Sequence, residues 1–532
     1  MLKYRRKTNE SEGETVILVH PSMIPEIDKY ASETLGIPTA TLMHRAGSAV
    51  ARAVRSYAPK GTSVAIFAGK GNNGGDGYAA AVELFDEYKV TVYDVFSVGQ
   101  RTDEGKRFLK MYHDLGGTVV PLTLDEKEVE HISSSGCLVD AVFGTGYSGD
   151  LPEIARRLIE LFATLHDTVK IAVDVPLGVN SELGTLTTDN PYYATATVAL
   201  GFVKVGLVSY PAGNYVGRLI IDNLGLQNER VLSRFSFDSY YTDSHIATET
   251  LPERASDSHK GSYGKLLMVA GSSTYLGAAH LSLEAALRSG VGYVTYLGEK
   301  AMCDSLVSKL PEAIYTPVAP EYITSDELAE IAQKHTAILI GSGIGTEHSD
   351  TLYAHLEKLL LTDGAPLILD ADAINVLAKR RERSLELIRA SLRKVVLTPH
   401  PLEFSRLSGI PTSEVQSNRL AVAKSFAKDN DCILVLKGAG TVITDGNENY
   451  INSTGSSALA KAGSGDVLAG CLAAFVASGV SPLRASALAA YLHGLAADSL
   501  SEELSEFGVI PSDLPREIAR QIRKIEQKKV NK

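Results

Sequence analysis

The sequence is poor in cysteine and has no long uninterrupted apolar run. Its four cysteines, Cys137, Cys303, Cys432 and Cys471, lie far apart and match neither a C-x-x-C pair nor a Cys/His zinc spacing. This scarcity argues against a disulfide framework and favours a reducing compartment. No stretch reaches the roughly 18 uncharged apolar residues of a membrane span, and the VILV run near the start is shorter than the about 7–15 apolar residues of a signal peptide. We therefore expect a cytoplasmic protein.

Positive charge is also scarce. The formal net charge of −11 and the pI of 5.7 argue against a broad attraction to nucleic acid or to an anionic membrane surface. A hydrophobic fraction of 44%, a charged fraction of 22% and a mean hydropathy of +0.01 argue against disordered, fibrous and membrane classes. A chain of 532 residues exceeds the roughly 250–300 residues over which one core grows, so we expect two large domains. Acidic α/β enzymes often self-associate, and we expect a homo-oligomer.

The first part of the chain alternates apolar runs with helical stretches. Continuous apolar runs at 62–68, 90–96, 137–143 and 169–175 are typical of strands buried on both faces of a parallel sheet. Glycine-rich turns follow several of these runs. The pattern predicts an α/β domain over residues 1–235 with a Rossmann-like doubly wound sheet, whose ligands bind at the carboxyl ends of the strands.

A polar segment separates this part from the rest of the chain. Residues 236–258 lack sustained periodicity, which indicates a linker or a swapped arm. The alternation then restarts, so residues 259–532 are predicted to form a second α/β domain that ends in a charged helix. Its expected strands lie within 264–272, 336–345, 366–372, 394–401 and 432–440.

Three strands of the first domain end in turns rich in glycine and polar side chains. The turn at 69–77 contains G-x-G-x-x-G and opens a helix, so its backbone N–H groups can meet the phosphates of a dinucleotide. The Asn and Asp residues of this turn offer oxygens to a hydroxylated ligand or a cation. Asp140 and Asp174 end two further strands before the turns at 144–150 and 176–180. Each Asp alone is typical of a cap or turn, but together they indicate one site at the rim of the sheet.

These segments resemble the NAD(P)H-hydrate epimerase family. The resemblance rests on LMHRAG (42–47), GNNGGDG (71–77), DAVFGTGYSGD (140–150), DVPLGVN (174–180) and KVGL (204–207). It implies that the first domain binds a damaged nicotinamide dinucleotide, with Asp174 as the leading acid/base residue and Lys204 as a weaker candidate. The residues that it implies around the hydrate are Asn72, Asn73, Gly74, Gly75, Asp76, Gly144, Thr145, Gly146, Tyr147, Ser148, Gly149, Asp150 and Asp174.

The same resemblance implies a potassium ion near Asn73 and Asp140, whose side-chain oxygens suit a hard cation. Leu177 departs from the family, which usually has Ser at this position of the potassium site. The site survives the change if the ligand is a backbone carbonyl, but not if a hydroxyl is required. His44 stands where an acidic residue is commoner, and we interpret it as a surface residue of a helix.

In the second domain, the segment AGSGDVLAG (462–470) opens a long apolar helix. Its small residues leave backbone N–H groups open to a phosphoryl group, and Asp466 can accept a proton from an attacking hydroxyl. Lys437 and the glycines of KGAGT (437–441) can approach nucleotide phosphates. Because no G-x-x-x-x-G-K-[ST] loop is present, a ribokinase-like α/β fold is favoured over a P-loop NTPase. The substrate side is expected to include residues at two other strand ends, which are Asp370, Asp372 and His400.

This domain resembles the ADP- or ATP-dependent NAD(P)H-hydrate dehydratase family. The motifs are HKGSYGKLLMVAGS (259–272), YLGAAHLSLEAALRSGVGYVT (275–295), GSGIG (341–345), LDADAIN (369–375), TPHPLEF (398–404), KGAGT (437–441) and AGSGDVLAG (462–470). The implied hydrate contacts are Ala278, Gly343 or Gly345, His400 and Asp466. The implied nucleotide contacts are Lys437, Gly438, Ala439, Gly440, Thr441 and Gly465. Ser342 replaces a frequent Pro of the family, and Leu402 replaces a usual Gly.

Both resemblances imply repair of one molecule, NADH or NADPH hydrated across its 5,6 double bond. The first domain would interconvert the R and S epimers. In the second, Asp466 would activate the C6 hydroxyl of the S form for attack on the terminal phosphoryl group of ADP, with magnesium sharing the phosphate charge, to give AMP, phosphate and NADH or NADPH. Two alternatives stay open: the second domain is a kinase of a small alcohol, or the first is a non-catalytic binding module. The sequence decides neither between ADP and ATP nor between NADH hydrate and NADPH hydrate.

Overall fold

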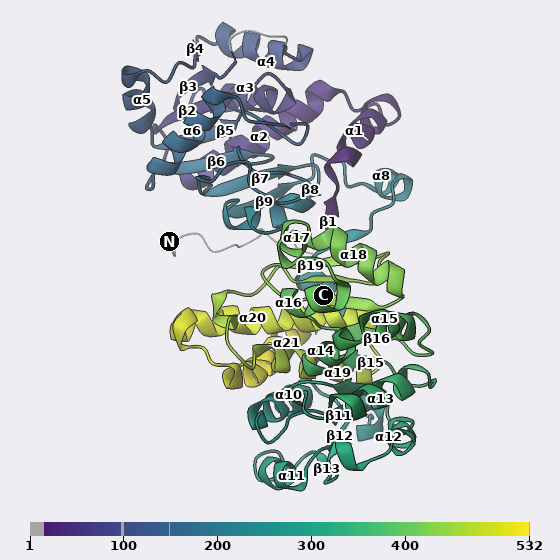
Figure 1. The fold of residues 1–532 in the computed structure, drawn as a ribbon. Helices are drawn as coiled ribbons and strands as arrows, with labels where there is room; N and C mark the ends of the chain where they lie inside the picture. The colour runs from purple at the N-terminus through teal and green to yellow at the C-terminus, as the bar shows by residue number, and fades with distance from the viewer. Residues whose placement is uncertain (1–14, 97–100, 148, 531–532) are drawn as a thin grey trace. The chain divides into compact units, whose positions relative to one another are not determined.

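The computed structural model describes residues 15–96, 101–147 and 149–530. The chain forms two compact units, the first extending to Phe237 and the second beginning at Asp238 (Figure 1). Each unit is built from a largely parallel sheet and helices, so the α/β class expected for both halves is confirmed. No helix within the described ranges is long and apolar enough to cross a bilayer.

The first unit contains a parallel sheet with the strand order β4-β3-β2-β5-β6-β7-β9. The chain reverses its direction of travel between β2 and β5, and ligands of doubly wound sheets bind at the carboxyl ends beside such a reversal. Strand β1 (Val16–Val19) pairs in parallel with β8 (Val203–Lys204), outside this seven-stranded sheet. The sheet strands are β2 (Ser63–Ala68), β3 (Lys89–Asp94), β4 (Thr118–Pro121), β5 (Cys137–Ala141), β6 (Val169–Val173), β7 (Ala196–Leu200) and β9 (Arg218–Asp222).

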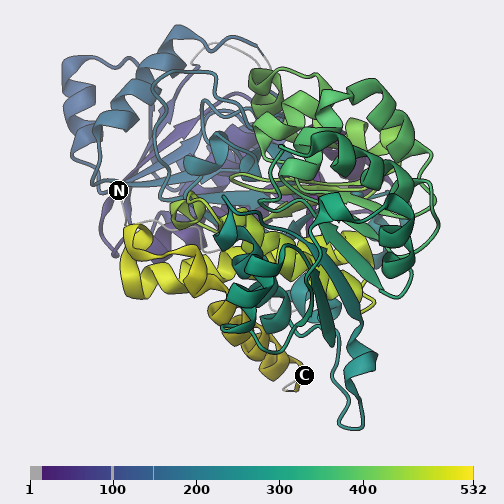
Figure 2. The ribbon, with the colours of Figure 1, turned by 60° about the horizontal axis from the view of Figure 1, so that its bottom comes forward.

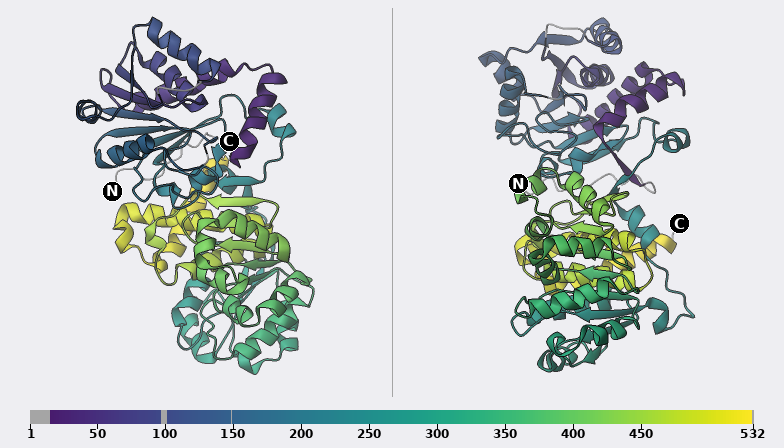
Figure 3. Two further views of the ribbon diagram at one scale, coloured as in Figure 1. Left: turned by 45° about the horizontal axis from the view of Figure 1, so that its top comes forward. Right: turned by 45° about the vertical axis from the view of Figure 1, so that its right-hand side comes forward.

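Helices cover both faces of this sheet (Figure 3). Successive residues of β2 alternate between two apolar cores, with Ile66 in the core beneath α2 and α3 and Phe67 in the core beneath α6. Burial on both faces explains why the strand is a continuous apolar run rather than an alternating one. The helices are α1 (Ile24–Glu33), α2 (Thr39–Tyr57), α3 (Asn72–Leu84), α4 (Asp103–Asp114), α5 (Glu126–Ser133), α6 (Glu153–Thr164), α7 (Val205–Val208) and α8 (Glu229–Arg234).

The strands of the second unit follow the order β13-β12-β11-β14-β15-β16-β17-β18-β19-β10. Pairing is parallel except at β18, which is antiparallel to both β17 and β19. This antiparallel hairpin was not predicted. The strands are β10 (Ser239–Thr242), β11 (Lys265–Val269), β12 (Tyr293–Leu297), β13 (Ile314–Thr316), β14 (Ala337–Ile340), β15 (Leu367–Leu369), β16 (Val395–Leu397), β17 (Ile433–Leu436), β18 (Val442–Thr444) and β19 (Asn449–Asn452).

Two helical layers enclose this second sheet (Figure 2). One core joins the sheet to α10, α19, α20 and α21 through residues such as Leu283 and Phe475, and the other joins it to α12, α13, α14 and α16 through Leu356 and Phe404. The helices are α9 (Ser244–Thr250), α10 (Leu276–Arg288), α11 (Lys300–Val307), α12 (Ser325–Ala332), α13 (Ser349–Leu360), α14 (Asp372–Lys379), α15 (Arg381–Arg389), α16 (Pro401–Ser408), α17 (Thr412–Ser417), α18 (Arg419–Asn430), α19 (Ser464–Ala477), α20 (Pro482–Gly508) and α21 (Leu514–Val530).

The expectation that 236–258 is a linker is wrong, because most of this segment is an ordered part of the second unit. Strand β10 pairs in parallel with β19, and the Asp243 carboxylate caps α9 by accepting a hydrogen bond from the Ile246 N–H at 2.9 Å. Tyr241 and Ile246 are buried. A strand of four residues followed by a helix of seven is too short to show periodicity, so the sequence pattern did not reveal either element.

Two candidate active sites

The glycine-rich turn of the first unit leaves one open backbone position at the start of α3. A Cβ atom added at Gly69 would lie 1.9 Å from the Val142 carbonyl oxygen, and one added at Gly74 would lie 2.0 Å from the Gly69 carbonyl oxygen. In contrast, a Cβ atom added at Gly71 would have no other atom within 4 Å. Gly71 directly precedes the first residue of α3. The turn therefore packs tightly against its own strand and helix while exposing the helix N-terminus to a ligand, as dinucleotide-binding turns do.

A cavity of about 740 Å³ lies against this turn. Many of the sequence-predicted residues line it, and they are Asn72, Asn73, Asp76, Gly144, Thr145, Gly146, Tyr147 and Asp174. Lys204 lines it as well, together with apolar residues of α1 and α2 such as Ile27 and Leu42. The strand ends of the doubly wound sheet thus converge on one hollow, as their positions in the sequence indicated.

Other predicted residues lie outside this lining. Gly74 and Gly75 are buried inside the packing of α3, where a Cβ at Gly75 would lie 2.4 Å from the Met43 methyl carbon. Gly149 and Asp150 are exposed, although the Tyr147 hydroxyl donates to the Asp150 carbonyl oxygen at 2.6 Å. Ser148 falls outside the described residues.

Asp174 and Lys204 form a buried ion pair in the cavity wall. The Asp174 Oδ1 accepts from the Lys204 ammonium group and, at 3.2 Å, from the Leu200 N–H. Lys204 also donates to the Leu200 carbonyl oxygen at 2.9 Å, which fixes its amine beside the carboxylate. Asp174 has a backbone φ of +64°, a left-handed conformation that is costly for a residue with a side chain. The carboxylate is therefore held in place by both its backbone and its partners.

Two further carboxyl groups approach this pair. Burial raises the pKa of Asp76 well above its usual value of 3.8, and the nearby Asp174 and Asp28 raise it further, against a lowering effect of Lys204. Burial also raises the pKa of Asp28. Burial and the neighbouring carboxylates thus disfavour ionisation of Asp76, while Asp174 is ion-paired with Lys204. The cavity therefore brings a carboxyl group of raised pKa close to an ion-paired carboxylate.

The residues expected around potassium offer two different environments. The Asn73 amide donates to the Phe143 carbonyl oxygen at 2.9 Å, which leaves its buried Oδ1 without a hydrogen-bond donor. The Asp140 carboxylate is buried and accepts from the Tyr192 hydroxyl and the Leu177 N–H, both at 2.6 Å. The Leu177 side chain lies in the apolar core, so only its backbone is available to a cation. The unpaired Asn73 oxygen fits a hard cation.

In the second unit, Asp466 lies in the first turn of α19, beside Lys437. The Lys437 Nζ would be 3.3 Å from a Cβ atom at Gly465, so the ammonium group sits directly over the start of the helix. Lys437 donates to Asp370 Oδ1 at 2.9 Å and lies 4.0 Å from Glu403 Oε2. Although burial lowers the pKa of Lys437, Asp370 and Glu403 raise it above its usual value. The N-terminus of α19 and the charged Lys437 ammonium group thus lie beside each other, where both can contact an anion.

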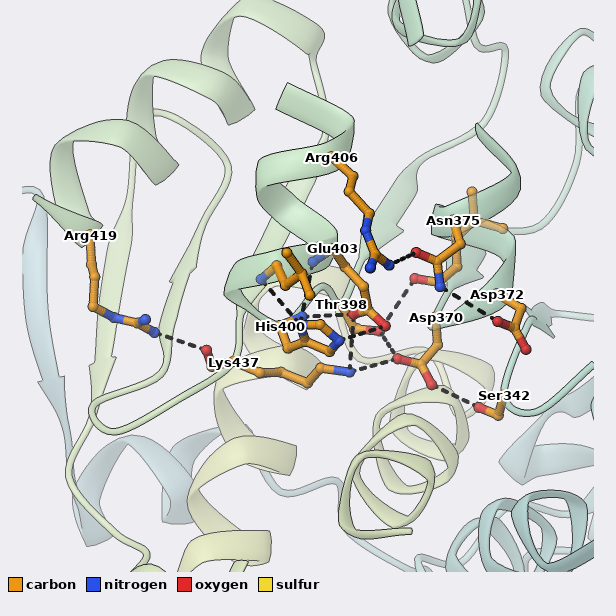
Figure 4. A network of polar contacts seen from close by, with 12 residues as sticks. Ser342, Asp370, Asp372, Asn375, Thr398, His400, Glu403, Arg406, Arg419 and Lys437 are labelled. Carbon is orange, nitrogen blue, oxygen red and sulfur yellow. Dashed lines mark hydrogen bonds and ion pairs between the residues drawn. The ribbon is translucent and has the colours of Figure 1, made fainter. Parts of the chain in front are cut away.

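Asp370 is the centre of a polar network that includes Lys437 (Figure 4). It is buried, and it accepts hydrogen bonds from Ser342 at 2.9 Å and from Thr398 at 2.7 Å, in addition to Lys437. These contacts satisfy its charge, so Asp370 positions Lys437 rather than facing a substrate. Asp372 accepts from the Gly345 N–H at 2.9 Å, which brings two more of the predicted residues together.

The electrostatic environment raises the pKa of Asp466 to about 7. Burial is the largest cause, and the negative charges of Asp370 and Asp372 add to it. Lys437 and, to a smaller extent, the Ser342 hydroxyl group act in the opposite direction. A carboxyl group that titrates near neutral pH is suited to general base catalysis, since it can both accept and release a proton there.

His400 has a structural role that the sequence did not indicate. It is the N-cap of α16, where its Nδ1 accepts from the Leu402 N–H at 3.1 Å and the Glu403 N–H at 3.3 Å. The Glu403 carboxylate reciprocates by accepting from the His400 N–H at 2.8 Å. Burial, together with Lys437, lowers the pKa of His400, so the ring is neutral and carries its proton on Nε2. Its Nε2 lies 3.3 Å from the Glu403 Oε1, so the Nε2–H faces this carboxylate.

The predicted nucleotide loop at 437–441 depends on a residue that sequence reasoning missed. Arg419 donates to the carbonyl oxygens of Leu436 at 2.8 Å and Lys437 at 3.1 Å. Gly438 has a φ of +140°, which only glycine adopts without strain, and Thr441 closes the loop by donating to the Gly438 carbonyl oxygen at 3.0 Å. Gly438 and Ala439 are exposed and Gly440 is half-buried. No sequence motif marks Arg419, because its role appears only when α18 packs beside β17.

Two of the residues expected to contact the hydrate in the second unit touch each other. A Cβ atom at Gly343 would lie 2.5 Å from the Ala278 Cβ, so the turn after β14 and the start of α10 can approach closely only with glycine there. His493, which sequence reasoning also missed, lies behind α19 with its Nε2 3.3 Å from the Ser464 hydroxyl. Burial lowers the pKa of His493 to about 4, so it is a neutral packing residue.

Comparison with known proteins gives matches in both units. Residues 266–520 match a family model described as NAD(P)H-hydrate dehydratase, and residues 39–206 match one described as YjeF-related protein N-terminus. The chain is 32% identical over 513 residues to the bifunctional NAD(P)H-hydrate repair enzyme Nnr of Moorella thermoacetica, which covers 93% of this chain and 95% of that relative. It is 33% identical over 505 residues to the protein of the same name from Coxiella burnetii, covering 94% and 98% respectively. The chain also matches a crystal structure of ADP/ATP-dependent NAD(P)H-hydrate dehydratase from Bacillus subtilis, co-crystallized with ATP/Mg²⁺. The two sequences are 34% identical, the match covers 53% of this chain and 97% of that one, and the TM-score is 0.47.

Proposed function

The chain belongs to the family of bifunctional NAD(P)H-hydrate repair enzymes, and from this premise we propose that its two units repair hydrated NADH and NADPH in sequence. The first unit, up to Phe237, interconverts the R and S epimers, and the second, from Asp238, dehydrates the S epimer at the expense of ADP or ATP. The four free, buried cysteines support a reducing, cytoplasmic setting, and the acidic composition supports a protein that binds neither nucleic acid nor membrane. We also infer that the protein is a homo-oligomer.

Epimerisation at C6 requires the hydroxyl group to leave one face of the ring and return on the other. In our proposal Asp76 donates its proton to the C6 hydroxyl, and the C–O bond breaks as the lone pair of the ring nitrogen forms a C6–N1 double bond, releasing water. A water molecule then adds to C6 from the opposite face, and Asp174 accepts the proton that it loses. Exchange with solvent returns the proton from Asp174 to Asp76. The observation that supports this proposal is that one cavity holds a buried carboxyl group of raised pKa, Asp76, and an ion-paired carboxylate, Asp174.

The remaining cavity residues bind and position the hydrate. Gly71 and the start of α3 face its pyrophosphate, while Lys204 holds Asp174 in place. The unpaired Oδ1 of Asn73 and the carboxylate of Asp140 would hold potassium, with the Leu177 backbone as a further ligand. The ion would supply a fixed positive charge beside the anionic substrate.

In the second unit, Asp466 is the base for phosphoryl transfer. It takes the proton of the C6 hydroxyl as that oxygen attacks the terminal phosphorus of ADP, and the bond between this phosphorus and the bridging oxygen breaks to release AMP. The N–H groups of α19 and the Lys437 ammonium group stabilise the transferring phosphoryl group. The C6–O bond then breaks with the help of the ring nitrogen, and loss of a C5 proton to the departing phosphate restores the 5,6 double bond. The observation that carries this assignment is the pKa of about 7 at Asp466, beside Lys437 at a helix N-terminus.

Magnesium would share the phosphate charge of the nucleotide. Among residues 15–96, 101–147 and 149–530, no group of three or more His, Cys, Asp or Glu side chains is arranged to hold a metal ion. This fits an ion that is bound mainly by phosphate oxygens and water.

The test is the recovery of absorbance at 340 nm from a mixture of R and S hydrates with ADP or ATP, for the wild type and Asp466→Asn. Complete, nucleotide-dependent recovery that is lost in the variant is the expected result. Recovery that stops at the S fraction would contradict the epimerase assignment. Absence of recovery with either nucleotide would favour a kinase of a small alcohol, because that reaction gives a stable phosphorylated product.

A further inference from the structure

An ion pair at the end of β3 lies next to the glycine-rich turn and outside the machinery described above. Asp94, the last residue of β3, is in register with Ala68, the last residue of β2 before the turn. The following N–H, of Val95, donates to the Ala68 carbonyl oxygen at 3.0 Å. The carboxyl ends of β2 and β3 are therefore side by side, with Asp94 at the edge where the turn begins.

The partner of Asp94 is Arg101. The Arg101 Nη2 donates to Asp94 Oδ2, and both side chains are largely buried, with 18% and 13% of their surface exposed. The Arg101 Nε lies 3.4 Å from the hydroxyl oxygen of Tyr78, which belongs to α3. The guanidinium group is thus fixed between the strand end and the helix whose N-terminus faces the cavity.

Side-chain contacts connect the lining of the cavity to the segment that follows Asp94. Lys70 lines the cavity, and its ammonium group lies 5.4 Å from the ring centre of Phe96, two residues beyond Asp94. The Phe96 ring is in turn 5.5 Å from that of Phe143, which also lines the cavity. A ligand that extends from Gly71 along Lys70 therefore reaches the segment that carries Asp94.

We propose that Asp94 and Arg101 read the 2′ position of the adenosine ribose, so that this pair sets the preference of the first unit for NADH hydrate or NADPH hydrate. The inference rests on the proposed epimerase function. In doubly wound sheets the pyrophosphate lies at the glycine turn, and an acidic residue about 20 residues further on, at the end of the next strand, accepts a hydrogen bond from the ribose. Asp94 occupies this place after Gly74. The hydrated ring then extends the other way, to Asp76 and Asp174.

The pair lets the two substrates use different partners. A 2′-hydroxyl group donates to the Asp94 carboxylate, whereas a 2′-phosphate is repelled by Asp94 and attracted by Arg101. With both charges present, the site accepts either hydrate. Removing one charge therefore shifts the preference, and the direction depends on which charge is removed.

The experiment measures epimerisation of each hydrate separately. The full chain carrying Asp466→Asn, which silences the second unit, is mixed with the R epimer of NADH hydrate or of NADPH hydrate, and the approach to the R/S equilibrium is followed by chromatography. Arg101→Gln is expected to lower kcat/KM for NADPH hydrate about tenfold or more while changing that for NADH hydrate little. Asp94→Asn is expected to lower kcat/KM for NADH hydrate by a similar factor and to raise the relative rate with NADPH hydrate.

The two variants break the same ion pair, so each is the control for the other. A pair that serves only stability would lower both rates by the same factor in both variants, and an unchanged ratio would overturn the inference. Arg101→Lys, which keeps the charge, should retain most of the NADPH hydrate activity if the first variant folds poorly. Arg52→Gln removes an ion pair with Asp222 at the surface and should leave the ratio unchanged. If the parent protein epimerises neither hydrate, the proposed function fails instead, which is a separate result.

Discussion

Replacing Asp466 with Asn should make the second unit more stable and less active at the same time. Burial and neighbouring carboxylates raise the pKa of Asp466 from its usual 3.8 to about 7. The folded protein therefore opposes ionisation of this side chain, whereas the unfolded chain allows it. Asparagine has nearly the same shape and carries no charge, so it removes the cost of the ionised form. It also removes the base, which should slow dehydration about 10²–10⁴-fold.

The size of the stability gain depends on pH in a defined way. Below pH 3.8 the carboxyl group is neutral in both states and costs nothing. Between 3.8 and about 7 the unfolded chain has released a proton that the folded chain retains, so the wild type loses about 1.4 kcal/mol of stability per pH unit as the pH rises. Above pH 7 the cost is constant, at an upper limit of about 4 kcal/mol. The gain from Asp466→Asn should therefore be about 2 kcal/mol at pH 5 and about 4 kcal/mol at pH 8.

Calorimetric unfolding of the full chain at pH 5 and pH 8 measures this difference, with and without the substitution. The transition of the second unit should rise in midpoint at both pH values, and more at pH 8. Asp304→Asn is the matched control, because Asp304 on α11 is exposed and its pair with Lys300 at the surface should contribute little. An Asp466→Asn protein that is less stable than the wild type at pH 8, or equally stabilised at both pH values, would refute the reasoning.

Three further changes test individual contacts. Ser342→Ala removes a hydroxyl group that lowers the pKa of Asp466, so the acid limb of kcat/KM for dehydration, measured against pH, should move to higher pH. Gly74→Ala places a Cβ 2.0 Å from a backbone oxygen and should destabilise the first unit by about 1–3 kcal/mol in thermal unfolding, whereas Gly71→Ala, in open space, should leave the midpoint unchanged and weaken hydrate binding. Asp76→Asn should slow R/S interconversion about 10²–10⁴-fold, measured by chromatography, without slowing dehydration of the S epimer.

The strands that support the candidate sites could be predicted from the sequence because helices cover both faces of both sheets. A strand such as β2 is then a continuous apolar run, and its predicted range of 62–68 agrees with Ser63–Ala68 to within a residue. Parallel strands end at one edge, so polar residues directly after them, such as Asp174, had to converge. The position of these residues followed from topology alone.

Residues whose role depends on packing between distant segments could not be found in this way. Asp28 reaches the cavity because α1 lies against it, and neither its neighbours in sequence nor its spacing distinguishes it from a surface acid. Arg419 supports the loop at 437–441 from a helix that shares no motif with it. His400 could be placed at a strand end, but its capping of α16 depends on a backbone geometry that residue types do not reveal.

The incorporation of β10 into the second sheet has a practical consequence for dividing the chain. A fragment that starts at residue 259 would lack β10 and α9, and β19 would then present a row of unpaired N–H and C=O groups. The apolar side chains that now contact Ile246 and Leu251 would also meet water. Open sheet edges recruit strands from other molecules, so such a fragment should aggregate, whereas one that starts at or before Asp238 keeps β10 paired with β19.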